Sequence, residues 1–183
     1  MRRLVVMTMA LAAALTLRAE RVAAQDEAMG FAQAQVADLE GMKDKFMGLG
    51  EAFPEDLMDW SPMEGVRSVK DVLVLAAVEC NLFPTMWGFD APEGVGENFG
   101  AENERLGAMT QADLVAAVGV AFDHLIGIVG DLDGEARMAT TSFFGRTVDV
   151  ETAIALAAFD MHEHLGQLIA YARSNEIVPP WSR

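Results

Sequence analysis

Hydrophobic residues recur every three or four positions along four separate stretches of this chain, which is the pattern of amphipathic helices. The first stretch runs from about residue 27 to residue 48, and Gly48 and Gly50 mark its end. The second begins at Ser68-Val-Lys-Asp71, where a serine followed three positions later by an acidic residue matches a helix-capping box. Pro84 lies in the last part of this stretch, so we expect a kink or an early stop there.

A third helix is predicted after Thr110-Gln-Ala-Asp113, a second capping sequence, and it ends near residues 131–134. Between the second and third helices, residues 88–107 contain glycine, proline and asparagine without a steady period. This composition is typical of a loop. We therefore predict a long loop over these residues, of the kind that often covers a functional site.

The last helix is predicted from near residues 148–151 to about Asn175, because Pro179 and Pro180 prevent it from continuing. A compact connection with a short extended part is expected before it, over residues 139–147. Four such helices with scarcely any period-two pattern predict an all-α fold, most simply an up-down-type four-helix bundle.

The start of the chain has the order of a secretory signal peptide. Two arginines precede an apolar run from Leu4 to Leu17, and a short polar segment that ends Val22-Ala23-Ala24-Gln25 follows. We predict cleavage after Ala24, which leaves residues 25–183 as one bundle domain of a periplasmic or secreted protein. The apolar run is shorter than the roughly 20 residues that span a bilayer, so we expect no stable membrane anchor after cleavage. An uncleaved anchor is the alternative.

Charge and cysteine content exclude several classes of function. The formal net charge is -15, and the predicted signal peptide holds more basic than acidic residues, so its removal makes the chain still more acidic. Nucleic acids and anionic membrane surfaces bind basic proteins, so we expect no nucleic acid partner. Cys80 is the only cysteine, which excludes an intrachain disulfide and a thiolate metal cluster.

The candidate chemistry lies in the last predicted helix. Asp160, His164, Gln167 and Tyr171 recur every three or four residues and share one face of that helix, whereas His162 points across it. Asp160 and His164 therefore stand in positions from which they could share one metal ion. The alternative is a hydrogen bond between these two side chains one helical turn apart.

Several segments resemble the DinB-like family of four-helix bundles. They are Trp60-Ser-Pro62, Gly65-Val-Arg-Ser-Val69, His164-Leu-Gly-Gln-Leu168 and Tyr171-Ala-Arg173, and with the helix order the resemblance covers nearly all of the mature chain. The resemblance implies a divalent metal ion held by three histidines. One lies on the second helix, and the other two form a His-x-x-x-His pair on the last helix.

In this sequence the three implied positions are Leu75, Asp160 and His164, so only one of them is a histidine. Leu75 cannot bind a metal ion, but Glu79 lies one helical turn further along the same face and offers a carboxylate. The resulting site has one histidine and two carboxylates, with manganese, iron, nickel or zinc as candidate ions. The alternative for Glu79 is an ion pair with a lysine or arginine of a neighbouring helix.

Two functions from different classes follow. The first is an exported DinB-like bundle with an incomplete metal triad, a non-catalytic binding or structural module whose partner is a second copy of the chain. The alternative is a divalent-metal-dependent transferase or hydrolase that acts on a small molecule through Asp160 and His164. A third hypothesis places an apolar ligand beneath residues 88–107. Cys80 is expected to be a packed small hydrophobe rather than a nucleophile.

Overall fold

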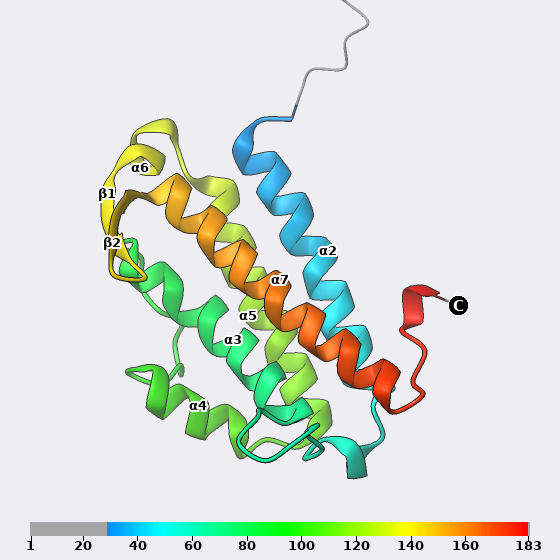
Figure 1. Ribbon diagram of the computed structural model, residues 1–183. Coiled ribbons are helices and arrows are strands. Elements are labelled where there is room, and N and C mark those ends of the chain that lie inside the picture. The colour runs from blue at the N-terminus through cyan, green and yellow to red at the C-terminus, as the bar shows by residue number, and fades with distance from the viewer. Residues whose placement is uncertain (1–28, 183) are drawn as a thin grey trace, which may run out of the picture. The chain divides into compact units, whose positions relative to one another are not determined.

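Four long helices make up most of the described chain, as the hydrophobic pattern predicts (Figure 1). The computed structural model of the protein describes residues 29–182, so the predicted signal peptide, residues 1–24, lies outside the described residues. The long helices are α2 (Phe31–Ala52), α3 (Val69–Met86), α5 (Gln111–Asp131) and α7 (Val150–Ser174). The all-α four-helix bundle is confirmed.

Shorter elements connect these helices. They are η1 (Glu55–Leu57), α4 (Phe99–Gly107), α6 (Gly134–Met138), the strands β1 (Thr140–Phe143) and β2 (Arg146–Asp149), and η2 (Pro180–Ser182). The two strands form an antiparallel hairpin, which confirms the short extended part expected before the last helix.

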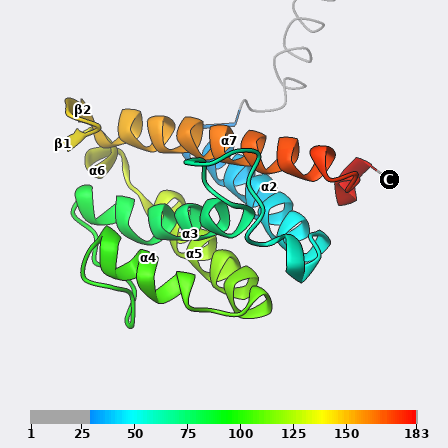
Figure 2. The ribbon, with the colours of Figure 1, turned by 60° about the horizontal axis from the view of Figure 1, so that its bottom comes forward.

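The prediction of one long loop over residues 88–107 was wrong for its second half, which forms α4. The side chain of Asn98 starts this helix by accepting a hydrogen bond from the Ala101 N–H at 3.1 Å. This helix is only nine residues long, and only Glu102 and Leu106 of it are buried. Its sequence therefore has too few apolar positions to show a helical period. Because α4 carries the chain back along the bundle, α3 and α5 run in the same direction (Figures 1 and 2).

The predicted helix starts are confirmed in atomic detail. The Ser68 side chain accepts the Asp71 N–H at 3.1 Å, and the Asp71 carboxylate accepts the Ser68 N–H at 2.9 Å, which completes the capping box. Thr110 caps α5 by accepting the N–H of Asp113 at 3.2 Å. The predicted early stop at Pro84 also holds, since α3 ends at Met86.

Helix α3 is the centre of the bundle and is buried on almost every side. It lies between α7 and α4 and packs along α5 (Figure 2). Phe46 of α2 and Phe122 of α5 fill the core beside it, with ring centroids 5.5 Å apart. Among the described helices, α5 is long and apolar enough to cross a membrane by composition alone, but its Leu114, Val118 and Phe122 are buried in this core.

The β1–β2 hairpin closes the bundle next to the end of α3. Phe143 pairs with Arg146, so only Phe144 and Gly145 form the turn. Both residues have positive φ, 47° and 71° respectively, which is the geometry of a type I′ turn. The hairpin is tied to α3 by the Thr141 hydroxyl, which donates to the Met86 carbonyl.

Replacing Gly50 by alanine should lower the free energy of unfolding by about 1–3 kcal/mol. An added Cβ would stand 2.6 Å from Cγ2 of Val115 on α5, and a β-branched side chain has little freedom to move away. Gly41 of the same helix is a matched control, since a Cβ there meets nothing within 4 Å and alanine should stabilise the helix by about 0.5–1 kcal/mol. Denaturant unfolding measures both. Equal effects would contradict close packing of α2 on α5.

Candidate metal centre

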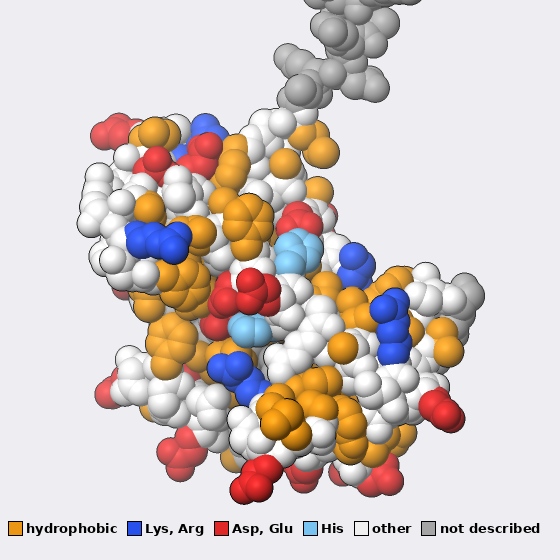
Figure 3. Space-filling view, viewed as in Figure 1, with side chains coloured by type: hydrophobic (Ala, Val, Ile, Leu, Met, Phe, Trp, Pro, Cys, Tyr) orange, Lys and Arg blue, Asp and Glu red, His pale blue; other side chains and the backbone are white. Residues whose placement is uncertain are grey.

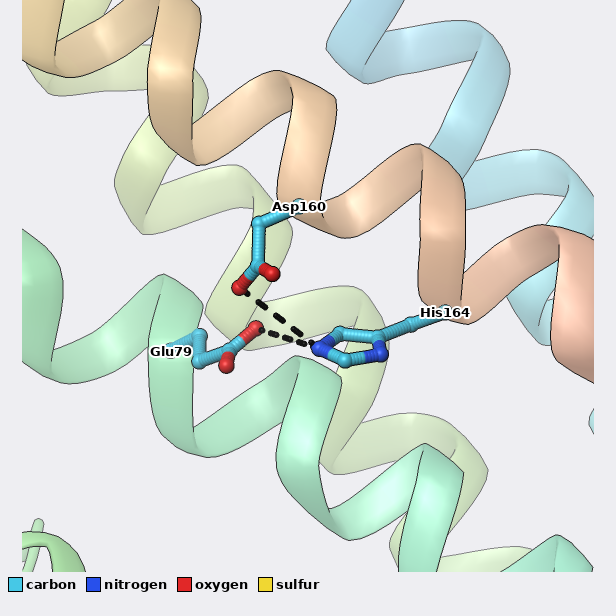
Figure 4. A group of neighbouring side chains, drawn as sticks. All are labelled: Glu79, Asp160 and His164. Carbon is cyan, nitrogen blue, oxygen red and sulfur yellow. Dashed lines mark ion pairs between the residues drawn. The ribbon is translucent and has the colours of Figure 1, made fainter. Parts of the chain in front are cut away.

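Acidic and histidine side chains gather on one face of the protein, over α3 and α7 (Figure 3). Within this group Glu79 of α3 meets Asp160 and His164 of α7 (Figure 4). The Nε2 atom of His164 lies 3.5 Å from Oε2 of Glu79 and 3.6 Å from Oδ2 of Asp160. One ligand atom from each residue lies within 4.8 Å of the other two. We call these three residues the candidate metal centre.

The local sequence explains why these side chains meet. Asp149 starts α7 by accepting the N–H of Thr152 at 2.7 Å, and the helix then continues without a break to Ser174. Asp160 and His164 are four residues apart and therefore lie on one face of α7. Helices α3 and α7 pack side by side in opposite directions (Figures 1 and 2), and this brings Glu79 to the same point.

The spacing of the ligand atoms fits a metal ion. Two atoms that each lie about 2.1 Å from one ion, at a tetrahedral angle, are about 3.4 Å apart. The separations of 3.5 Å and 3.6 Å around His164 Nε2 are close to this value. A hydrogen bond between nitrogen and oxygen is usually shorter, at about 2.7–3.2 Å. The two separations from His164 Nε2 are therefore longer than usual hydrogen bonds and match the spacing of two ligands of one cation.

Burial strengthens this conclusion. The side chains of Glu79 and His164 are only 8% and 12% exposed, whereas Asp160 is 27% exposed. Oε2 of Glu79 and Nε2 of His164 are buried without a hydrogen-bond partner in residues 29–182. A buried polar atom without a partner costs about 1–3 kcal/mol. A cation bound between these two atoms would remove that cost for both.

The charges of the centre also favour a cation. Burial raises the pKa of Glu79, and although His164 opposes this rise, the nearby Asp160 adds to it. Burial lowers the pKa of His164, but contact with Glu79 and the charges of Glu79 and Asp160 outweigh burial, so this pKa lies above its usual value. The two carboxylates thus favour positive charge at His164, and a metal ion would compete with a proton for the same position.

The structure decides between the alternatives that the sequence leaves open. Glu79 faces His164 and not a lysine or arginine, so the predicted ion pair with a neighbouring basic residue was wrong. The predicted hydrogen bond between Asp160 and His164 was also wrong, since their nearest atoms are 3.6 Å apart. Leu75 lies half-buried on α3 and is not among the grouped ligand atoms.

The other candidate residues have structural partners. His162 points away from the centre and contacts Asp38 of α2, with 2.9 Å between Nε2 and Oδ2. Gln167 donates to the Tyr171 hydroxyl at 2.6 Å, so these two residues satisfy each other. Cys80 is fully buried, and burial, followed by the charge of Glu79, raises the pKa of its thiol well above the usual value. Cys80 is therefore a core residue and no nucleophile.

Arg67 is a residue of the centre's surroundings that the sequence does not single out. Its carbonyl accepts a hydrogen bond from the Tyr171 hydroxyl at 3.0 Å, which fixes the backbone just before α3 against α7. Its side chain is exposed, and its positive charge acts on His164. Its position is the one sequence signal that could have pointed to it: Arg67 directly precedes the capping Ser68, at the start of the helix that carries Glu79.

The apolar site predicted beneath residues 88–107 has little support. A pocket of about 240 Å³ does lie there, between Val95, Arg105 and Val120. It is smaller than the roughly 300–1,000 Å³ of typical ligand sites. Glu93 and Arg105 also place charged groups in its wall. The candidate metal centre is therefore the better candidate for function.

Comparison with known proteins identifies the fold. The DinB-like protein YjoA of Bacillus subtilis matches with a TM-score of 0.61 and 20% identity, over 79% of this chain and 93% of that protein. YfiT of Bacillus subtilis, described as a probable metal-dependent hydrolase with an unusual four-helix bundle topology, matches with a TM-score of 0.63 and 15% identity, over 83% of this chain and 93% of that one. No protein-family model and no curated protein sequence matches the chain. The predicted DinB-like resemblance is thus confirmed at the level of the fold.

Proposed function

We propose that this DinB-like bundle binds one divalent metal ion through Glu79, Asp160 and His164 and hydrolyses a small molecule at that position. The observation that carries the proposal is that three ligand atoms from two helices converge. Two of these atoms, Oε2 of Glu79 and Nε2 of His164, are buried without a hydrogen-bond partner in the described chain. The name of YfiT, a probable metal-dependent hydrolase of the same fold, supports the reaction class. From the predicted signal peptide, residues 1–24, we further propose that this activity lies outside the cytoplasm.

Each residue of the centre has a distinct part in this proposal. One histidine and two carboxylates are a hard ligand set, which suits manganese, iron or magnesium better than zinc. A bound divalent ion would supply Lewis acidity, which polarises a carbonyl or phosphoryl oxygen. Asp160 is the most exposed of the three, so the small molecule approaches from its side. Glu79 is the most buried of the three, and burial raises its pKa, so it would hold the ion from the side facing the core.

A non-catalytic module is the second candidate function. Leu75 and Asp160 stand at two of the three positions where the DinB-like resemblance implies histidine. A metal ion at the altered site would then link α3 to α7 and stabilise the bundle without chemistry. Such a module would show metal-dependent stability and no metal-dependent turnover.

Hydrolysis assays separate the two functions. We expect the manganese- or iron-loaded full chain to hydrolyse at least one member of a panel of small amides, esters, lactones and phosphoesters, and His164→Ala to abolish that turnover. His162→Ala is the matched control, because His162 lies on the same helix but contacts Asp38 instead. Metal-dependent stability without turnover of any of these compounds would favour the non-catalytic module.

A further inference from the structure

An exposed group of aromatic rings lies next to the candidate metal centre. Phe83 of α3 packs against Phe99 and Phe144, with ring centroids 6.0 Å and 5.7 Å away. Phe83 is buried, but Phe99 is 36% exposed and Phe144 is 55% exposed. We call these three residues the aromatic shelf. Phe99 and Phe144 thus form a contiguous, partly exposed apolar surface over the buried Phe83, and such a surface can mark a ligand-binding site.

The aromatic shelf borders the metal centre on one side. Phe83 is four residues beyond Glu79 on α3, so both residues lie on the same face of that helix, one turn apart. Figure 3 shows hydrophobic side chains next to the acidic and histidine group, on the side of the β1–β2 hairpin. A small molecule bound at the centre would therefore meet the shelf in that direction.

The turn that carries Phe144 is not built for stability alone. Its first position has a φ of 47°, where asparagine or glycine is preferred and a bulky side chain is strained. In return the Phe144 ring packs edge-on against Phe83 and beside Phe143, at 4.4 Å between centroids, yet half of its surface stays exposed. Strained backbone conformations are often found where a protein binds a ligand, which suggests that the Phe144 ring contacts a ligand.

Arg67 supplies a positive charge close to the same centre. The Tyr171 hydroxyl holds its backbone, and its guanidinium makes no ion pair within the part of the chain that the structure describes. Arg67 directly precedes α3, whereas Phe83 lies four residues beyond Glu79, so along this helix Arg67 and the aromatic shelf lie on opposite sides of Glu79. An exposed arginine without a carboxylate partner is well suited to bind a carboxylate in two parallel hydrogen bonds.

We propose that the substrate of this centre is an N-aroyl amino acid, with its aromatic ring on the shelf of Phe83, Phe99 and Phe144 and its carboxylate on Arg67. The inference rests on the proposed function, because it places the amide bond of the substrate at the metal centre between these two groups. Hydrolysis breaks the amide C–N bond and forms a C–O bond to water. The products are the aromatic acid and the free amino acid, with no change of oxidation state.

Calorimetric titration of the full chain with N-benzoylglycine tests the inference through binding rather than turnover. N-benzoylglycinamide lacks the carboxylate and N-acetylglycine lacks the ring, and we expect each to bind at least about tenfold more weakly, as expected for one lost ion pair or ring contact. Arg67→Ala should reduce the affinity for N-benzoylglycine about tenfold and leave that for the amide unchanged. Asparagine suits the first position of this turn, so Phe144→Asn should keep the fold. It should remove the preference for N-benzoylglycine over N-acetylglycine.

The metal content of the same samples separates this inference from the proposed function. Protein that binds metal but shows no preference for N-benzoylglycine over both controls would overturn the inference and leave the metal centre standing. Protein that shows the preference, and loses it in Arg67→Ala and Phe144→Asn, would support the substrate class even if no metal were bound. Absence of both metal binding and preference would overturn both proposals.

Discussion

Replacing Glu102 by alanine is expected to lower the free energy of unfolding by about 3 kcal/mol. Glu102 has no exposed surface, and its carboxylate accepts from Arg105 Nε at 2.7 Å and Nη2 at 2.6 Å. It also accepts from Asn81 Nδ2 at 2.9 Å and from the Gly96 N–H at 2.8 Å. Truncation would leave all of these donors without an acceptor. The expected loss of stability lies near the low end of the range for breaking a buried ion pair, because the Arg105 side chain is 36% exposed and water can reach it.

Acid provides an independent check of the Glu102 prediction. Burial raises the pKa of Glu102, but Arg105, Gly96 and Asn81 outweigh burial, so this pKa lies below its ordinary value of 4.5. Its contribution to stability is therefore present above pH 4.5 and is lost as the pH falls through the lowered pKa. In denaturant unfolding, Glu102→Gln should differ from the wild type at neutral pH and approach it in acid.

Glu104→Ala is the matched control, since Glu104 lies on the same helix and is exposed. It should change the free energy of unfolding by no more than about 0.5 kcal/mol. If Glu102→Ala and Glu104→Ala behave alike, the buried carboxylate does not hold α4 and the loop before it against α3.

Metal ions are expected to stabilise the bundle through the candidate metal centre. At a free manganese concentration one hundred times the dissociation constant, the free energy of unfolding should rise by about 2.7 kcal/mol. His164→Ala should remove much of this gain. Losing an outer-sphere partner of a metal site already costs about 10–100-fold in affinity, and the loss of a direct ligand costs at least as much.

Unfolding curves with and without manganese, recorded for three proteins, test this prediction. The wild type should gain stability, His164→Ala should gain clearly less, and His162→Ala should behave like the wild type because His162 contacts α2 instead. An equal gain in all three proteins would indicate binding to the acidic surface in general and not to the centre.

Much of the fold could be predicted because it depends on local patterns. The capping box at Ser68 and Asp71 sets the start of α3 within a few residues, and the same holds for Thr110 and α5. The pairing of Asp160 with His164 on one face follows from helical spacing alone. Gln167 and Tyr171 satisfy each other for the same reason.

The parts that could not be predicted depend on contacts between distant segments. Glu102 and Arg105 look like surface residues of a loop until Asn81, 21 positions earlier, supplies a buried partner. Whether Glu79 faces a basic residue or His164 depends on how α3 is rotated against α7, which helical spacing does not determine. The role of Arg67 likewise arises only because Tyr171, 104 positions later, holds its carbonyl.

Metal content tests the central claim most directly. The chain from residue 25 onward is purified without a histidine tag, exposed in turn to manganese, iron, nickel and zinc, and dialysed. Elemental analysis should then find about one retained ion per chain. Asp160→Ala, carried through the same steps, should retain none. Failure of the wild type to retain any of these ions, or equal retention by Asp160→Ala, would contradict a metal centre formed by Glu79, Asp160 and His164.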